Sequence, residues 1–514
     1  MNTIKTKVST QPKILQASEV EAIRRDSEGQ SIIHAHGVFD LLHVGHIRHL
    51  EQAKTLGDCL VVSLTPDRFV NKGPNRPAFT ERLRAEALAA MEAVDFVVIN
   101  DQPTAVELIL QLRPQIFVKG KEFADLEDIT QAVGKEAEAI AEVGGRIEFV
   151  GDITFSSSSL INQYMGTLND EQQAFLEGVR SRYSLDEILS WLEKPAGDVV
   201  ALMSETILDE YLFSSPLGQS SKDPILAVQQ DRLEVCPGGG LAIANHLAGF
   251  CRSVHFVSRL GENTADLESC QSLLRPNVEA DLLTRVNTPT IRKRRVVDAY
   301  SGNKLLEIYE MDDRVNDTAE DQALVSSLNA GEAHLDGGPL VVADYGHGLI
   351  SPALAHTLGQ WTGFLALNCQ CNAGNKGMNS FKKYPRADYL CMAEKELQME
   401  YREGKSDESL YLGKLADSLG AAQALLTRGK CGTFFYQAGS DGHAGPCLTN
   451  HVVDRVGAGD SVLAVTSLLL QYQAPPDIVN LTANAAGAIQ VSELGNRHCL
   501  DRVTLSRFLT SLLK

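Results

Sequence analysis

The stretch HGVFDLLHVGHIRHLEQAK, residues 36–54, decides the fold of the amino-terminal part of the chain. It follows the apolar run SIIHAHG (31–37), which is typical of a buried strand, and it continues into residues with helical spacing. A turn between a strand and a helix brings the N–H groups of the first helical turn to the carboxyl end of the strand. Anionic ligands bind at that place in α/β proteins, so we expect a phosphate-binding site in this turn.

Strand-like and helix-like segments alternate around this turn, which predicts a parallel sheet with right-handed crossovers. The strands are expected at residues 31–37, 59–65, 94–100, 115–120 and 146–152, with helices at 46–57, 81–93, 104–113 and 126–145. A second series of expected strands comprises residues 198–204, 339–344, 364–368, 387–391, 422–427 and 432–437, followed by a helix at 460–471. The fold class is therefore α/β.

The chain has 514 residues, which is too long for one hydrophobic core, so two domains are expected. A polar, helical segment ending in Pro195-Ala196-Gly197 separates the two α/β series. We expect one domain at residues 1–165, a helical linker at 166–197 and a second domain at 198–514.

Composition narrows the classes of function. Lys and Arg number 47 against 66 Asp and Glu, giving a net charge of −19, which opposes nucleic-acid binding. The ten cysteines are scattered, as expected for reduced thiols, and Cys369 with Cys371 alone makes a poor zinc site. No signal peptide is evident, and no apolar run reaches the roughly 18 residues of a membrane span. We expect a cytoplasmic protein that binds neither nucleic acid nor membrane.

Two imidazoles in the opening stretch are suited to a triphosphate. His43 and His46 can stabilise charge that develops at the α-phosphate when pyrophosphate is displaced. Gly37 and Gly45 allow the backbone to approach the ligand closely. A metal site would need further ligands, because these histidines supply two at most.

The run GVFDLLHVGH resembles the G-x-F-D-x-x-H-x-G-H signature of the cytidylyltransferase-like nucleotidyltransferases. The H-x-G-H element also occurs in class I aminoacyl-tRNA synthetases, but the K-M-S-K-S-like loop that those enzymes need is not found in this sequence. The resemblance implies a Rossmann-like domain whose nucleotide site includes Phe39 and Asp40 beside the residues named above.

Further segments resemble the adenylyltransferase half of the bifunctional ADP-heptose synthases. NKGPNRPAF resembles their K-G-P-x-R-P stretch, and RPQIFVKGKEF resembles their V-K-G-G-D-Y element, with Lys121 and Glu122 replacing Gly-Asp. GDITFSSSSLIN resembles their phosphate loop. The resemblance implies phosphate contacts from Lys72, Ser156, Ser157, Ser158 and Ser159. It also implies that Lys119 contacts phosphate and acts as a catalytic residue.

VVDRVGAGDSVLAV, residues 452–465, carries the strongest signal in the second half. Gly457-Ala458-Gly459 before a helix can form an anion hole from backbone amides. Asp460 is then placed to deprotonate an attacking hydroxyl during phosphoryl transfer. A turn followed by an N-capping aspartate is the alternative interpretation.

This segment resembles the D-T-x-G-A-G-D signature of the ribokinase-like, or PfkB, sugar kinases. CPGGGLAIANHLAGF resembles their sugar-binding element, which implies sugar contacts from Gly238, Gly239 and Asn245, and SETILDEY implies one from Asp209. LLTRGKCGTFFY and ANAAGAIQV imply nucleotide contacts from Thr427, Gly429 and Asn484. The domain implied is a ribokinase-like α/β domain.

Several residues depart from that pattern. Arg455 replaces a small residue, and His347 replaces the lysine of the heptose kinases. The magnesium-linked P-N-x-x-E motif reads M-A-E-K-E, so its glutamate, Glu396, is the expected metal residue. The D-P-K region is replaced by LNCQCNAGNKGMNSFKKYPRAD, whose asparagines and basic residues suggest a different acceptor site. The two domains also stand in the reverse of the usual order.

The sequence therefore favours a bifunctional sugar kinase and sugar 1-phosphate nucleotidyltransferase that makes an ADP-heptose-like product. Expected ligands are ATP, Mg²⁺ and a sugar or sugar phosphate. The resemblance also implies that the protein forms a homodimer. Two alternatives stay open: a degenerate, sugar-binding kinase-like domain beside an active transferase, and a transferase acting on a polyol phosphate or cofactor precursor.

Overall fold

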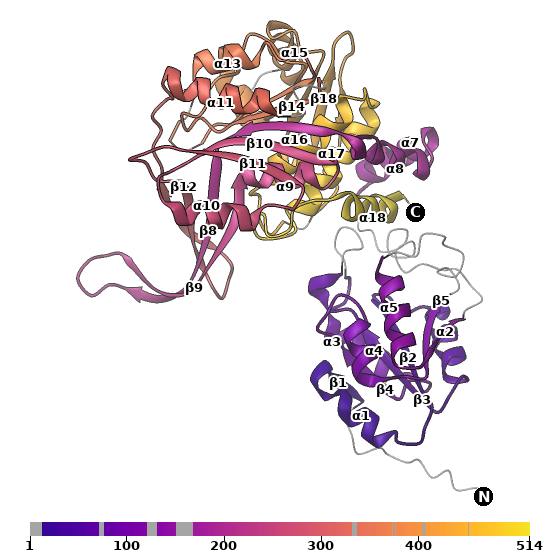
Figure 1. Cartoon of the computed structure of the whole chain (residues 1–514). Helices are drawn as coiled ribbons and strands as arrows, with labels where there is room; N and C mark the ends of the chain where they lie inside the picture. Colours follow the sequence, from indigo (N-terminus) through magenta and orange to yellow (C-terminus); the bar gives the residue numbers. More distant parts are fainter. Residues whose placement is uncertain are drawn as a thin grey trace, which may run out of the picture. The chain divides into compact units, whose positions relative to one another are not determined.

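The computed structural model describes residues 13–70, 77–120, 131–150, 168–331, 337–372, 374–375, 377–402, 407–450 and 452–513. The chain divides into two compact units, Met1–Thr167 and Leu168–Leu513. Both are α/β, as the sequence predicts (Figure 1).

Unit 1 is built on a six-stranded parallel sheet of order β1-β4-β3-β2-β5-β6. Its strands are β1 (Ile14–Gln16), β2 (Ile32–Gly37), β3 (Cys59–Leu64), β4 (Phe96–Ile99), β5 (Ile116–Gly120) and β6 (Arg146–Val150). Its helices are α1 (Val20–Asp26), α2 (Val44–Lys54), α3 (Glu81–Ala89), α4 (Val106–Leu112) and α5 (Gln131–Glu142). The five predicted strands are present, and the three-residue β1 is an edge strand that the sequence pattern did not reveal.

Successive side chains along each strand point to opposite faces of this sheet, and apolar side chains pack on both faces. In β3, Leu60 and Val62 belong to one apolar cluster, and Val61 between them belongs to another. A strand whose successive side chains are all apolar is covered by helices on both faces, which is the arrangement expected for a parallel sheet.

Unit 2 contains a nine-stranded sheet of order β11-β10-β7-β14-β15-β16-β17-β18-β19. These strands are β7 (Val199–Ser204), β10 (Ser253–Leu260), β11 (Val278–Thr284), β14 (Leu340–Asp344), β15 (Leu365–Cys369), β16 (Tyr389–Ala393), β17 (Gln423–Thr427), β18 (Thr433–Gln437) and β19 (His443–Gly445). Two helical layers cover it, one comprising α11 (Thr318–Ala330), α13 (Pro352–Leu358), α14 (Glu394–Tyr401) and α15 (Glu408–Ser418). The other comprises α9 (Gly240–Ala248), α16 (Ala458–Leu470), α17 (Pro476–Gln490) and α18 (Arg502–Leu513). A further helix is α10 (Thr264–Leu273).

A second, four-stranded sheet of order β13-β12-β8-β9 adjoins the large one. Its strands are β8 (Thr206–Gln219), β9 (Leu226–Gly239), β12 (Ile291–Asp298) and β13 (Lys304–Glu310). The far end of the β8–β9 ribbon projects from the body of the unit (Figure 1). We call this sheet the lid sheet. Its strand β8 starts at Thr206, just after the carboxyl end of β7.

The segment expected as a linker forms α7 (Asp170–Arg182) and α8 (Leu185–Glu193). Buried residues from both helices, including Leu176 and Ile188, belong to the same apolar cluster as α16 and α17. The structure therefore makes these helices part of unit 2 rather than a separate connection. In the described part of the chain, no helix combines the length and apolarity that a membrane crossing requires.

Candidate functional site

The chain order of the unit 1 strands places a ligand crevice beside β2. From β2 the chain continues to β3 and β4 on one side, and β5 and β6 lie on the other. Ligands of parallel α/β sheets bind at the carboxyl ends of the strands where the order switches in this way. The turn with His43 follows β2, and Lys119 lies near the end of β5, so these predicted residues share that edge.

His43 is the N-cap of α2, and its Nδ1 accepts a hydrogen bond of 3.1 Å from the Gly45 N–H. Its ring stacks on that of His46 with 4.0 Å between centroids, and Phe39 meets His46 edge-on at 5.4 Å. Burial lowers the pKa of His43. An imidazole that accepts at Nδ1 carries its proton on Nε2, so His43 presents a neutral donor to a phosphate.

The loop before His43 is held by backbone contacts. Phe39 has a φ of 50°, and a Cβ on Gly37 would lie 3.1 Å from the Phe39 ring, which explains the need for glycine. Asp40 is buried, and its Oδ1 accepts from the N–H groups of Ala78 at 2.6 Å and Phe79 at 3.3 Å. These two hydrogen bonds give Asp40 a role in fixing the loop, and its contact with the nucleotide stays a prediction.

Lys119 forms an ion pair of 2.7 Å with Glu136 of α5. Beneath the site, Ser63 Oγ lies 2.7 Å from His34 Nε2 and 2.8 Å from His36 Nδ1. Burial, and secondarily the charge of Lys119, lowers the pKa of His34 to about 3. These two histidines are therefore neutral parts of a hydrogen-bonded layer under the site.

Arg84 is a positioning residue that sequence reasoning missed. Its guanidinium is buried and donates to the carbonyls of Val38 and Thr65, the latter at 2.9 Å. It also pairs with Asp67 at 2.6 Å. The arginine thus ties the loop after β2 to the loop after β3. Its only sequence signal was a charged residue on the buried side of a helix.

Some predicted residues of this site lie outside the described residues, namely Lys72, Ser156, Ser157, Ser158 and Ser159. Their phosphate-binding roles stay predictions.

Unit 2 has a corresponding switch in strand order. Strand β7 lies between β10 and β14, and the chain continues from β7 to β10 and β11 on one side and to β14 and the later strands on the other. The loops after β14 and β15 meet the first turn of α16 at this edge.

The first turn of α16 has the backbone expected of an anion hole. Gly457 is its N-cap with a φ of 80°, and a Cβ there would overlap the side-chain oxygen of Asn496. Ala458 begins the helix, and a Cβ on Gly459 would meet no atom within 4 Å. The N–H groups of this turn have no acceptor within the helix and can bind a phosphoryl group.

Asp460 lies in the same turn and is buried. Its Oδ1 accepts from the Tyr345 hydroxyl at 2.7 Å and from Gln370 Nε2 at 3.0 Å. Burial raises the pKa of Asp460 to about 6, while these two hydrogen bonds act in the opposite direction. A carboxyl with such a pKa is ionised at neutral pH and basic enough to take a proton from a hydroxyl.

The lid sheet contributes charged side chains near Asp460. Asp209 of β8 is buried and pairs with Arg295 of β12 at 2.7 Å. A Cβ on Gly238 would lie 2.8 Å from the Asp209 carboxyl, so the predicted pair is adjacent. Lys293, which the sequence analysis did not single out, has its Nζ 5.6 Å from the ring centroids of both Tyr309 and Tyr345. Desolvation lowers the pKa of Lys293.

Asn245 does not join this group. Its Nδ2 donates to the Leu273 carbonyl at 2.8 Å, and its Oδ1 accepts from the Arg275 N–H at 2.8 Å. Both ends of the amide hold the chain after α10, and the expected sugar contact stays a prediction. Gly239, with a φ of 51°, is the N-cap of α9 beside Gly238.

Glu396, the expected metal residue, caps a helix in the structure. Its carboxylate accepts from the N–H groups of Ala393 at 2.7 Å and Cys371 at 3.3 Å, capping α14. Burial raises its pKa to about 7, so it is a poor direct ligand for a cation. Among the residues that the structure describes, no group of three or more His, Cys, Asp or Glu is arranged to hold a metal ion.

The predicted nucleotide residues lie around β17 and α17. Thr427 ends β17, and Gly429 follows with a φ of 56° and open space at its Cβ position. Asn484 of α17 is buried, and its Nδ2 donates to Thr433 Oγ1 at 2.6 Å and to the Asn480 carbonyl at 2.8 Å. Asn484 therefore holds α17 against β18, and its contact with the nucleotide stays a prediction.

Two α/β units, each with a helix N-terminus at a switch in strand order, define a protein with two domains of the kind that binds phosphorylated ligands. Residues 34–163 match the cytidylyltransferase-like family, and residues 219–502 match the pfkB family of carbohydrate kinases. The second match covers more than half of the sequence. The chain belongs to the pfkB carbohydrate kinase family, with a cytidylyltransferase-like domain before the kinase domain.

Similar curated proteins match the amino-terminal part. Bifunctional protein HldE of Syntrophotalea carbinolica is 39% identical over 147 residues, which are 28% of each chain. Bifunctional protein HldE of Geotalea uraniireducens is 41% identical over 143 residues, 27% of this chain and 28% of the relative. The chain thus matches less than a third of the length of these relatives. Among solved structures, phosphofructokinase-2 from Escherichia coli with substrates and products is 18% identical, with a TM-score of 0.48 over 62% of this chain and 99% of that one.

Proposed function

We propose that the chain is a bifunctional enzyme that phosphorylates a sugar or sugar phosphate and couples a sugar 1-phosphate to a nucleotide. The observation that carries the proposal is Asp460, a buried carboxylate with a pKa of about 6 in the first turn of α16. The histidine turn of unit 1 supports the second activity.

In the kinase reaction, the acceptor hydroxyl lies between Asp460 and the transferring phosphoryl group. Asp460 takes the hydroxyl proton as the acceptor oxygen bonds to phosphorus and the bond to the leaving ADP breaks. The amides of residues 457–459 stabilise the phosphoryl charge. Asp209 and Gly238 line the acceptor side, where Asp209 accepts hydrogen bonds from hydroxyl groups.

In the transferase reaction, a phosphate oxygen of the sugar 1-phosphate attacks the α-phosphate of the nucleotide, and pyrophosphate leaves. The nucleophile is already anionic, so no protein base is required. The Nε2–H of His43, together with His46, stabilises the charge that develops at the α-phosphate. We propose ATP as the nucleotide in both units and an ADP-heptose-like product, on the resemblance to ADP-heptose synthases.

Mg²⁺ would accompany the nucleotide in both reactions. Magnesium in such sites is held largely by phosphates and water, with one or two carboxylates. The described residues fit this arrangement only in part, because Glu396 has both oxygens on backbone amides. The proposed steps therefore rest on the side chains and amides named above.

The proposal is tested by 31P NMR of the full chain with MgATP and a panel of sugars, heptose phosphates and sugar 1-phosphates. We expect ADP and pyrophosphate, each with its own acceptor. Asp460→Asn should abolish ADP formation and spare pyrophosphate release, and His46→Ala should do the reverse. Loss of both products in either variant, with folding intact, would contradict two independent sites.

A second candidate is a transferase beside a kinase unit that binds sugar without turnover. The capping role of Glu396 favours it, because the family motif at this position is linked to magnesium. Sugar binding by calorimetry, without ADP over the whole panel, would support this candidate against the first.

The homodimer also belongs to the proposal. Apolar side chains of the lid sheet are exposed, with Leu217 at 66%, Leu226 at 54% and Leu306 at 52%. A second copy that covers these residues would remove apolar surface from water. Light scattering should then give twice the chain mass, and Leu226→Lys should reduce it to the monomer mass.

A further inference from the structure

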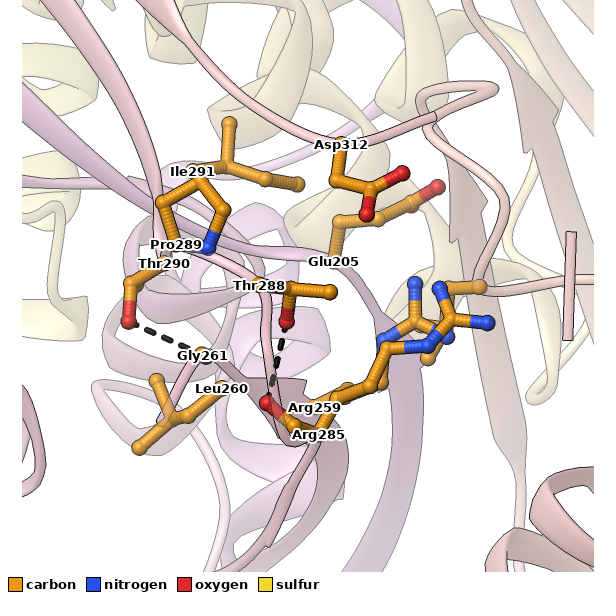
Figure 2. A pocket seen from close by; sticks show the side chains of 11 residues that line it. Glu205, Arg259, Leu260, Gly261, Arg285, Thr288, Pro289, Thr290, Ile291 and Asp312 are labelled. Carbon is orange, nitrogen blue, oxygen red and sulfur yellow. Dashed lines mark hydrogen bonds between the residues drawn. The ribbon is translucent and has the colours of Figure 1, made fainter. Parts of the chain in front are cut away.

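A small cavity of about 20 Å³, partly open to solvent, lies at the carboxyl ends of β7 and β10 (Figure 2). None of the catalytic and binding roles assigned above uses the side chains that line it. Two arginines, Arg259 at the end of β10 and Arg285 just after β11, run in the same direction along one side of it. The carboxylates of Glu205 and Asp312 lie close together, on the same side of the view as the two guanidinium groups.

The two arginines differ in how their charge is compensated. Arg285 pairs with Glu320 through Nε at 2.7 Å and Nη2 at 2.8 Å, and its Nη1 donates to the Arg314 carbonyl at 2.8 Å. Arg259 donates to the amide oxygen of Asn316, and within the described residues it forms no ion pair. Burial, and secondarily the charge of Arg285, lowers the pKa of Arg259. Arg259 is thus a largely buried cation without a carboxylate partner.

The acidic residues of the cavity are already engaged. Asp312 accepts from the Arg314 side chain at 2.7 Å, and Glu205 accepts from the N–H groups of Tyr345 and His347 at 3.0 Å each. Burial raises the pKa of Glu205 to about 7, so it carries only part of a charge at neutral pH. Thr290 Oγ1 accepts from the Gly261 N–H at 3.1 Å, which leaves its own hydroxyl hydrogen as a donor.

We propose that this cavity binds the phosphate or carboxylate group of a small anionic metabolite, with Arg259 as the principal charge. A guanidinium binds such groups through two parallel hydrogen bonds, and it gains most where water is excluded.

The cavity is separate from the nucleotide side of the unit. Strand β10 and strand β17, where the nucleotide residues lie, are five positions apart in the sheet, which corresponds to roughly 24 Å at the usual strand spacing. Asp460, whose partners follow β14 and β15, lies between them. The anionic group therefore belongs either to the acceptor molecule or to a separate effector.

Calorimetry on the full chain tests the site, with a non-hydrolysable ATP analogue present to occupy both nucleotide sites. The probes are inorganic phosphate, glucose 6-phosphate and uncharged glucose. We expect Arg259→Gln to weaken binding of the two anions by about tenfold or more, since a charge-assisted bidentate contact is lost. Lys222→Gln, which removes one exposed positive charge from the same unit, should leave anion binding unchanged.

Unchanged anion affinity in Arg259→Gln, or an equal loss in Lys222→Gln, would overturn the proposal. If Arg259→Gln does not fold, Arg259→Lys keeps the charge but loses the bidentate geometry, and a loss of about threefold is expected. Kinase assays identify the source of the anion. Competition of phosphate with the acceptor alone indicates an acceptor group, and a change in kcat at unchanged acceptor KM indicates an effector. A phosphate effect that persists unchanged in Arg259→Gln would count against the site.

Discussion

The hydroxyl of Tyr345 donates a hydrogen bond of 2.7 Å to Oδ1 of Asp460, and both residues are buried. Burial alone would push the pKa of this carboxyl further up, because a carboxylate without water is costly. The tyrosine, together with Gln370, offsets part of that effect and holds the carboxylate in one orientation. Tyr345, which directly follows β14, therefore helps to set the basicity of Asp460 in α16.

Replacement of Tyr345 by phenylalanine should shift the pH dependence of the kinase reaction. Without the hydroxyl donor the carboxylate is less stabilised, so the pKa of Asp460 rises above about 6. Activity falls as Asp460 becomes protonated, so the acidic limb of the kcat profile should move to higher pH. Tyr436→Phe, a tyrosine on β18, is the control. An unmoved acidic limb would show that another group titrates there.

Asp460→Asn should raise stability while removing the kinase activity. The folded-state pKa of Asp460 lies above its unfolded value, so folding disfavours the carboxylate. This cost is absent below about pH 4, grows as pH rises to about 6, and is on the order of 3 kcal/mol above that. Urea unfolding of the wild type and the variant at pH 4.5 and pH 8 measures it. Equal differences at both pH values would contradict the account.

The transferase reaction should not need a protonated His43. Because burial lowers the pKa of His43 and its Nδ1 is an acceptor, the active form is the neutral imidazole. Pyrophosphate release should therefore be retained as the pH rises from 6.5 to 8 and should decline only on acidification. His43→Gln, which keeps a donor near Nε2, should retain more activity than His43→Ala. A decline with rising pH through 6.5 would indicate that a cation is required.

Arg84 should be required for the shape of the unit 1 site. Its buried guanidinium holds two loop carbonyls and Asp67, so Arg84→Met leaves those acceptors unpaired. Each buried group left without its charged partner costs about 1–3 kcal/mol, and pyrophosphate release should fall with stability. Arg82→Met, on the same helix but 86% exposed at its side chain, is the matched control. Similar unfolding midpoints for the two variants would contradict the role of Arg84.

The sequence predicted those parts of the fold and of the candidate sites that depend on residues close together in the chain. Five of the six strands in unit 1 and six of the nine strands in the large sheet of unit 2 follow from local spacing, as do the turn at His43 and the helix start at Gly457. The strands β1, β10, β11 and β19 were not predicted. The lid sheet did not follow as readily, because most of β9 and the second part of β8 are exposed and lack an apolar period. The sequence could not show that Asn245, Glu396 and Asn484 also hydrogen-bond groups of the protein that are distant in the sequence, and their ligand contacts stay predictions.

Arg84, Ser63 and Lys293 were missed for a related reason. Each acts through residues distant in the sequence, and a single charged or polar side chain in a strand or helix gives no signal of its partners. The alternation in IRKRRVVD was nevertheless informative in retrospect. Arg292 and Arg294 pair with Glu210 on one face of β12, so Lys293 and Arg295 must point to the other face, which adjoins Asp209.

Lys293 should contribute to acceptor binding or to turnover in the kinase reaction. It is 9% exposed, its Nζ lies between the rings of Tyr309 and Tyr345, and it forms no ion pair within the described residues. Such a cation beside Asp460 offsets negative charge that arrives with the acceptor and the phosphoryl group. Lys293→Met should lower kcat/KM for the acceptor by about tenfold to a hundredfold, and Lys293→Arg should restore part of it. Lys382→Met, a 61% exposed lysine, is the control. Unchanged kcat/KM in Lys293→Met would show that the lysine only fills space between the two tyrosines.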